Sequence, residues 1–173
     1  MNVLELFKPI RAFIFDLDGV LTDGTVLVVA NGLQARKMSI KDGFAIQMAL
    51  KMGYRVKIIS GGHSPELQDR LEKLGVKDIS MSVPDKKKLI TEFITGKKLK
   101  QEQVLYMGDD LPDIPALGAV GLACCPADAA GEVKEAVQYI SPYKGGDNCV
   151  RDVIEKVLKL NDHWQYRVDV TSR

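Results

Sequence analysis

Short apolar segments alternate with longer amphipathic segments along most of this 173-residue chain. A continuous apolar run of about four to eight residues is typical of a parallel strand covered on both faces, and an apolar period of about 3.6 residues indicates a helix. The pattern predicts strands at 11–15, 55–59, 78–81, 104–107, 120–124 and 138–140, and helices at 43–52, 65–74, 86–95, 114–117, 129–136 and 147–160.

This order of elements predicts the fold class. Strands that alternate with helices need crossover connections, which are right-handed and place helices on both faces of a mostly parallel sheet. The expected fold is therefore α/β and Rossmann-like. The sequence contains no internal repeat and no low-complexity linker, so we expect one domain over residues 1–173.

Residues 24–39 interrupt the alternation and predict a β-hairpin. Residues 25–29 favour a strand, and Asn31-Gly32 is a strong signal for a type I′ turn. Residues 33–38 favour a second strand that runs back along the first. Ligands of open α/β sheets bind beyond the carboxyl ends of the strands. Because the hairpin directly follows the first strand, we expect it beside the active site.

Reactive side chains follow the four clearest strands. In a parallel sheet the carboxyl ends of the strands lie side by side, so these residues should converge on one cleft. Each signal alone is weak, since Lys86-Lys-Lys88 resembles a solvated helix start and Asp109-Asp110 a helix cap. Four signals in order are harder to explain without a site. They are Asp16 and Asp18, then Ser60-Gly61-Gly62, then Lys86, then Asp109, Asp110 and Asp113.

These residue types indicate a magnesium and phosphate site. Crowded carboxylates raise one another's pKa unless a cation lies among them. Oxygen ligands without His or Cys favour Mg²⁺, whose shell is often completed by water and a substrate phosphate. Ser60 and the N–H groups of Gly61 and Gly62 offer donors to phosphate next to the helix start at Ser64-Pro65. Asp16 and Asp18, two apart on a segment expected to be extended, should point the same way.

Composition excludes several other classes of protein. The formal net charge is +1, which suggests neither a nucleic-acid nor an anionic membrane partner. No apolar run approaches the roughly 18–20 residues of a membrane span, and the N-terminus lacks the pattern of a signal peptide. The three cysteines form no disulfide or zinc framework, and Cys124 and Cys125 are expected to be buried. A cytoplasmic location is therefore expected.

The segments Asp16-Leu-Asp-Gly-Val-Leu-Thr22, Ser60, Lys86 and Gly108-Asp-Asp-Leu-Pro-Asp113 resemble the four motifs of the haloacid dehalogenase superfamily. The resemblance extends over nearly the whole chain. The segments 39–46, 124–126, 139–146 and 151–152 are similar to its subfamily of 3-deoxy-D-manno-octulosonate 8-phosphate phosphatases, which supply the inner-core sugar of lipopolysaccharide.

The resemblance implies a two-step hydrolysis. Asp16 attacks phosphorus and forms an aspartyl-phosphate, while Asp18 protonates the leaving sugar oxygen and later deprotonates the attacking water. It further implies that Asp16, Asp109 and the backbone carbonyl of Asp18 hold Mg²⁺. The remaining implied roles are phosphate binding by Ser60 and Gly61, charge balance by Lys86, and support of the metal ligands by Asp110 and Asp113.

The spacing of the motifs leaves no room for a cap domain. Only the hairpin fits between Asp18 and Gly43, and only one helix and one strand fit between Ser60 and Lys86. Capless members of this family form homotetramers in which neighbouring subunits help to close the site, so the resemblance implies the same here. The hairpin and the tail at 161–173, with Trp164 and Tyr166, are candidate contacts.

One position departs from the family. His63 stands where many members have an arginine that suits the substrate carboxylate. We expect Gly61, Gly62 and His63 to contact the substrate. Other basic residues are expected to contact it in place of the missing arginine, chiefly Lys41 and Arg70, with Lys144 and Arg151 as further candidates.

Three alternatives remain open at this stage. The substrate is alternatively a nine-carbon keto-deoxy sugar acid 9-phosphate, and the chain is alternatively an inactive binding module. A phosphotransferase or mutase is disfavoured because such enzymes must exclude water, which a capless site does poorly.

Overall fold

The structure is a computed structural model that describes residues 2–165. Its main sheet has six parallel strands in the order β5-β4-β1-β6-β7-β8. These strands are β1 (Ala12–Asp16), β4 (Arg55–Ile59), β5 (Asp78–Ser80), β6 (Val104–Met107), β7 (Leu122–Cys125) and β8 (Tyr139–Ile140). The longer helices are α2 (Ile40–Lys51), α3 (Pro65–Lys73), α4 (Lys86–Gly96) and α7 (Cys149–Leu160), and the short ones are α1 (Leu4–Phe7), α5 (Ile114–Leu117) and α6 (Gly131–Glu135).

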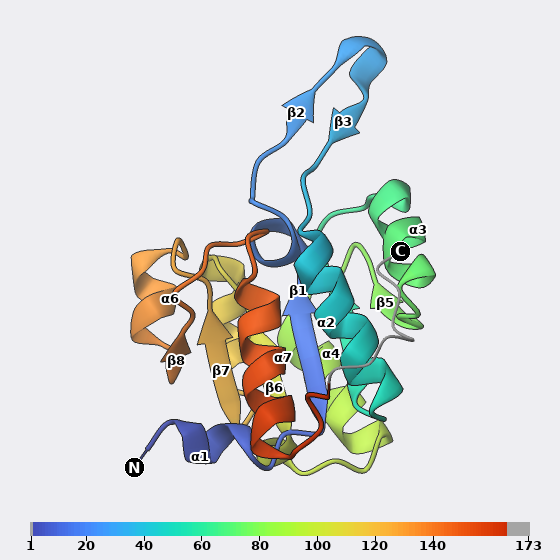
Figure 1. Ribbon diagram of the computed structural model, residues 1–173. Coiled ribbons are helices and arrows are strands. Elements are labelled where there is room, and N and C mark those ends of the chain that lie inside the picture. The colour runs from blue at the N-terminus through green and yellow to red at the C-terminus, as the bar shows by residue number, and fades with distance from the viewer. Residues whose placement is uncertain (1, 166–173) are drawn as a thin grey trace.

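Helices cover both faces of the sheet, as the α/β pattern predicted (Figure 1). Side chains of β1 alternate between the faces, so Phe13 and Phe15 pack into one core with α1, α2, α3 and α7. Ala12 and Ile14 pack into the second core with α4, α5 and α6. Because both faces are buried, β1 is apolar at every position before Asp16.

The strand order places the site. The chain passes from β1 to β4 and β5 on one side, then crosses to β6, β7 and β8 on the other. The order therefore reverses beside β1, and a crevice forms at the carboxyl ends of the strands at such a switch point. Asp16 ends β1 there, Ser60 follows β4, and Asp109 lies just beyond β6.

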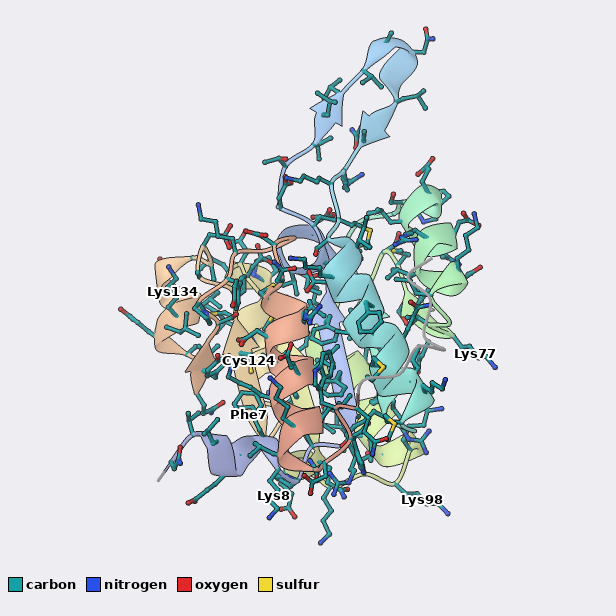
Figure 2. All side chains as sticks on the ribbon, in the orientation of Figure 1. Phe7, Lys8, Lys77, Lys98, Cys124 and Lys134 are labelled. Carbon is teal, nitrogen blue, oxygen red and sulfur yellow. The ribbon has the colours of Figure 1, made fainter. Side chains whose placement is uncertain are left out.

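The predicted hairpin is present as β2 (Leu27–Val28) and β3 (Gln34–Ala35), and it projects away from the body of the molecule (Figures 1 and 2). Asn31 and Gly32 have φ values of 64° and 73°, the two positive values that a type I′ turn needs. Both strands are shorter than predicted. An isolated bridge between Thr22 and Met38 closes the base of the hairpin.

No cap domain is present among the described residues. The chain forms only the hairpin between the β1 loop and α2, and only α3 and β5 between β4 and α4. Cys124, Cys125 and Cys149 are free and buried, and burial was predicted for the first two. No helix within residues 2–165 has the length and apolar character to cross a membrane.

Several predicted boundaries were wrong. The helix α2 begins at Ile40 rather than residue 43, because Ser39 caps it by accepting the Asp42 N–H at 3.3 Å. The helix α7 begins two residues late, since Asn148 before it has a positive φ of 78°. The helix α1 was not predicted, and β7, β8 and α6 differ from prediction by one or two residues.

The C-terminal segment folds back as far as it is described. Trp164 packs edge-on against Phe44 and under the guanidinium of Arg151, so its ring contacts its own chain. Tyr166 and the rest of the predicted tail lie outside the described residues.

Two glycines hold the loop after β1 against the loop before α7. A Cβ on Gly145 would lie 1.9 Å from the carbonyl oxygen of Gly19, and one on Gly146 would lie 2.5 Å from the Asp23 nitrogen. The Gly146 N–H also donates to the Val20 carbonyl at 2.9 Å. These backbones approach so closely that no side chain fits between them.

Replacement of Gly146 should therefore destabilise the fold. Its φ is +65°, and the clashing atoms are backbone, so Gly146→Ala is expected to lower the free energy of unfolding by about 1–3 kcal/mol. Gly96→Ala is the matched control, because nothing lies within 4 Å of a Cβ there. Thermal unfolding of both variants checks this; equal melting temperatures would contradict it.

Candidate active site

Asp16 lies at the end of β1 with 7% of its surface exposed, and the loop Leu17–Leu21 turns tightly after it. Its Oδ1 accepts the Leu17 N–H at 2.7 Å, which orients the carboxylate. Gly19 makes the turn possible, since its φ is +86° and a Cβ there would lie 1.9 Å from Asp109 Oδ2. The loop thus brings β1 directly against the segment after β6.

The ammonium group of Lys86, from the first turn of α4, lies between two carboxylates. Its Nζ is 2.9 Å from Asp16 Oδ2 and 2.6 Å from Asp113 Oδ1. Burial alone would lower the pKa of Lys86, but Asp16 and Asp113 outweigh it and raise the pKa above its ordinary value. Lys86 is therefore held in its charged form.

Asp113 is buried and fully bonded. Besides Lys86, its Oδ1 accepts the Tyr106 hydroxyl at 2.6 Å. Its Oδ2 accepts the N–H groups of Asp109 and Asp110 at 2.9 and 3.3 Å. Both oxygens are thus used to fix Lys86 and the backbone that carries Asp109. Asp110 is exposed, and its Oδ1 caps the next turn at the Leu111 N–H.

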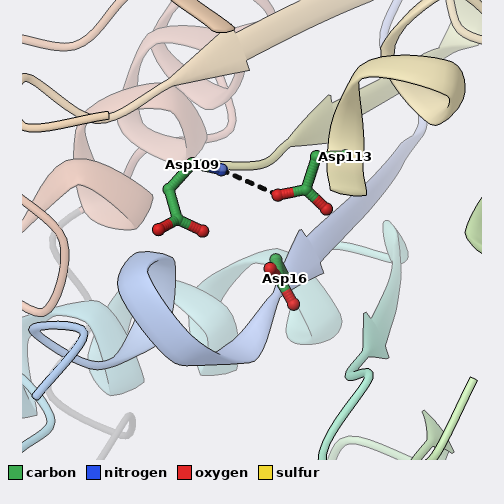
Figure 3. A group of neighbouring side chains, drawn as sticks. All are labelled: Asp16, Asp109 and Asp113. Atoms are coloured by element: carbon green, nitrogen blue, oxygen red, sulfur yellow. Dashed lines mark hydrogen bonds between the residues drawn. The ribbon is translucent and has the colours of Figure 1, made fainter. Parts of the chain in front are cut away.

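The carboxylates of Asp16, Asp109 and Asp113 gather at one point (Figure 3). One oxygen from each lies within 4.8 Å of the others, and the donor set contains only oxygen. Burial, then repulsion from Asp113, raises the pKa of Asp16 to about 7. Burial, then Asp16 and Asp113, raises the pKa of Asp109 to about 7. Such carboxylates fit a hard divalent cation, which would relieve their repulsion.

Asp18 lies across the same pocket, which has a volume of about 260 Å³. Its Oδ1 accepts Arg36 Nε at 2.8 Å and lies 3.4 Å from the Thr22 hydroxyl. Its side chain is 41% exposed, and Oδ2 faces Gly62. From the sequence, Asp16 and Asp18 were expected to point the same way because both would lie on an extended strand. That reason was wrong, because β1 ends at Asp16 and the strand does not continue to Asp18. Both carboxylates nevertheless line one pocket.

The segment after β4 lies opposite Asp18. Ser60 is buried, and its Oγ and Asp18 Oδ2 each lie 3.7 Å from the place of a Cβ on Gly62. The Gly62 N–H donates to Ser60 Oγ at 3.1 Å, so the expectation that this N–H is free was wrong. Gly61 and His63 are exposed in the same loop.

The chain was compared with known proteins. Residues 77–154 match the family model for haloacid dehalogenase-like hydrolases. The 3-deoxy-D-manno-octulosonate 8-phosphate phosphatase of Yersinia pestis is 32% identical over 93% of this chain and 86% of its own length. The corresponding phosphatase of Haemophilus influenzae is 33% identical over 90% of this chain and 86% of its own length.

This chain belongs to the haloacid dehalogenase-like hydrolases, in the branch of these phosphatases. Solved structures agree. That of the Yersinia pestis phosphatase superimposes with a TM-score of 0.90 over 93% of this chain and 87% of that one. That of the Moraxella catarrhalis phosphatase, determined with magnesium ion, phosphate ion and KDO, has a TM-score of 0.89 at 27% identity and covers 94% of both chains.

The predicted sugar-binding residues of this family member do not gather at the pocket. Lys41 and Arg151 line a different pocket of about 590 Å³ between α2 and α7. Arg70 lies on α3 with its guanidinium near Gly43 of α2. Lys144 is exposed in the loop before α7. Their contacts with substrate stay predictions.

Sequence reasoning missed other residues of the site. Arg36 binds Asp18, Tyr106 binds Asp113, and Thr22 receives the N–H groups of Gly19 and Gly24 at 3.1 and 3.3 Å. A tyrosine in an otherwise apolar strand was the one available signal, since a buried hydroxyl needs a partner. Nothing in the sequence distinguished Arg36 from Lys37.

Metal binding at these carboxylates should depend on pH. Asp16 and Asp109 have pKa values raised to about 7, so near that pH each must lose part of a proton before it can bind a cation. We expect Mg²⁺ affinity to fall below about pH 7, by up to about tenfold per pH unit for each proton released, and to level off above about pH 8.

Calorimetric titration of Mg²⁺ in buffers of different ionisation enthalpy measures the released protons. Asp109→Asn should lose most of the affinity, whereas Asp69→Asn, on the exposed surface of α3, should not. An affinity that stays constant from about pH 6 to 9 would show that these carboxylates do not take up the ion.

Proposed function

We propose that this chain hydrolyses 3-deoxy-D-manno-octulosonate 8-phosphate to the free sugar acid and phosphate. The observation that carries this proposal is the buried Asp16 carboxylate, which Lys86 and the Leu17 N–H hold at the end of β1. The substrate assignment is supported by the relatives in Yersinia pestis and Haemophilus influenzae, and by the phosphatase of known structure with magnesium ion, phosphate ion and KDO.

In the first step, a carboxylate oxygen of Asp16 forms a bond to phosphorus, and the bond from phosphorus to the sugar oxygen breaks. Asp18 gives its proton to that departing oxygen. Arg36 occupies Asp18 Oδ1, so Oδ2 is the atom that faces the phosphate side of the pocket and carries the proton. Lys86 offsets the charge of Asp16 and the phosphoryl group.

In the second step, Asp18 removes a proton from water, whose oxygen bonds to phosphorus. The bond between phosphorus and Asp16 breaks, phosphate leaves, and both aspartates return to their starting forms. Ser60, with the Gly61 N–H, is proposed to bind phosphate oxygens in both steps, since Ser60 directly follows β4, the strand that pairs with β1.

Mg²⁺ is the proposed cofactor, held by Asp16, Asp109 and the backbone carbonyl of Asp18. When bound, it neutralises charge on the phosphate and on the crowded carboxylates. Asp113 belongs to the same cluster, but its two oxygens already accept four hydrogen bonds or ion pairs. We therefore propose that Asp113 and Asp110 hold the metal ligands in position.

We propose that four copies of the chain assemble through the hairpin. Leu27, Val28 and Leu33 are 65%, 71% and 61% exposed, and they belong to the hairpin, which projects from the body of the molecule (Figure 1). An exposed apolar hairpin of this kind is typical of an interaction surface. A cytoplasmic reaction in lipopolysaccharide synthesis is part of the same proposal, supported by three free cysteines and by the named relatives.

The reaction can be tested with phosphate release from the eight-carbon substrate and from a nine-carbon keto-deoxy sugar acid 9-phosphate. We expect faster turnover of the eight-carbon substrate with Mg²⁺, and a loss on the order of 10³-fold or more in kcat for Asp16→Asn. Asp69→Asn is the control. Better turnover of the nine-carbon substrate would reassign the substrate, and an inactive wild type would indicate a binding module instead.

The assembly can be tested by light scattering. The wild type is expected at four times the mass of one chain, and Val28→Lys should dissociate it, because burial of an unpaired charge in an apolar contact is costly. Ile140→Lys is the matched control, on an exposed position of β8. A wild type that runs as a monomer would refute the tetramer.

A further inference from the structure

The guanidinium of Arg36 contacts Asp18, one of the residues that line the pocket. Its Nε donates to Asp18 Oδ1 at 2.8 Å, and Asp18 is the residue proposed to protonate the departing sugar oxygen. Lys86, the other cation that contacts the pocket carboxylates within the described chain, is bound to Asp16 and Asp113 on the opposite, phosphate side. The two cations are thus assigned to different parts of the substrate by the carboxylates they contact.

Arg36 also has unused donors. A guanidinium offers five N–H groups, and the contact with Asp18 uses the one on Nε. Within residues 2–165, its two terminal amino groups make no other hydrogen bond or ion pair. A side chain only 13% exposed has already lost much of its freedom, so binding with these groups costs little further ordering.

The chain holds Arg36 in place at the base of the hairpin. It lies between β3 and the bridge that joins Thr22 to Met38, which closes the hairpin just above the pocket. Its neighbour Lys37 is exposed. The backbone therefore directs one basic side chain to Asp18, at the edge of the pocket, and the next one to solvent.

The pocket is lined mainly by acidic side chains, so a cation beside it matters for the binding of an anionic substrate. Its lining includes Asp16, Asp18, Asp109, Asp110 and Asp113, with Lys86 as the one basic residue. A substrate that carries a second anion besides its phosphate would be repelled unless a cation met that anion. Planar, bidentate binding of a carboxylate is what a guanidinium does best.

We propose that the terminal amino groups of Arg36 bind the carboxylate of the sugar acid and select substrates that have one. This inference rests on the proposed function, because it requires a substrate with a carboxylate on the leaving group. It gives the pocket a substrate cation from the hairpin that is already bound to the lining residue Asp18.

The test compares two primary sugar phosphates, of which only the first carries a carboxylate: 3-deoxy-D-manno-octulosonate 8-phosphate and glucose 6-phosphate. For the first, Arg36→Ala should raise KM by about 10- to 100-fold, the range expected for a lost charged hydrogen-bond pair. For the second, any loss of kcat/KM reports the effect of Arg36 on Asp18, which is common to both substrates, and we expect it to be at least about tenfold smaller than the loss for the first. Arg36→Lys should restore part of the lost affinity, and Lys37→Ala, which removes one charge from the adjacent exposed position, should behave as wild type.

Calorimetric binding of the free sugar acid gives a readout without catalysis, and Arg36→Ala should weaken it by a similar factor. Equal losses of kcat on both substrates would show that Arg36 acts through Asp18 and would overturn the inference. So would an unchanged preference between the substrates. A wild type without preference for the sugar acid phosphate would instead refute the proposed function, and the inference with it.

Discussion

The Lys86 ammonium group lies between the carboxylates of Asp16 and Asp113, and the rest of the site is arranged around that contact. Five aspartates line a pocket of about 260 Å³, which is a high density of like charge for a half-buried space. Burial and mutual repulsion raise the pKa of Asp16 and Asp109 to about 7. Lys86 offsets part of this repulsion, and a divalent cation is suited to offset the rest.

Asp113 holds several groups of the site in position through its hydrogen bonds. It binds Lys86 and the Tyr106 hydroxyl with one oxygen, and the backbone N–H groups of Asp109 and Asp110 with the other. A single buried side chain therefore links α4 to β6, and Lys86 extends this link to Asp16 at the end of β1. Gly19 and Gly108 permit the close approach, because a Cβ on either would strike Asp109 or Asp113.

Much of this arrangement could be predicted from local signals. Apolar strands followed by charged residues locate Asp16, Lys86 and Asp109 at neighbouring strand ends, because parallel topology leaves few alternatives. The Asn31-Gly32 turn was equally clear, since few residue pairs accept two positive φ values. The predictions failed where the outcome depends on the conformation that a loop or hairpin adopts. Arg36 meets Asp18 only after the hairpin closes, and the Gly62 N–H turns to Ser60 only once that loop has formed.

The central claim is that Asp16 is the nucleophile, and trapping of the phosphoryl-enzyme tests it most directly. The enzyme would be mixed with Mg²⁺ and the eight-carbon substrate, quenched in acid within milliseconds, and digested for mass spectrometry. If Asp16 is the nucleophile, we expect one added phosphoryl group on the peptide that contains Asp16, formed and lost at rates that match turnover. Phosphate release without any phosphorylated aspartate, or with the group on Asp18 or Asp109, would contradict it.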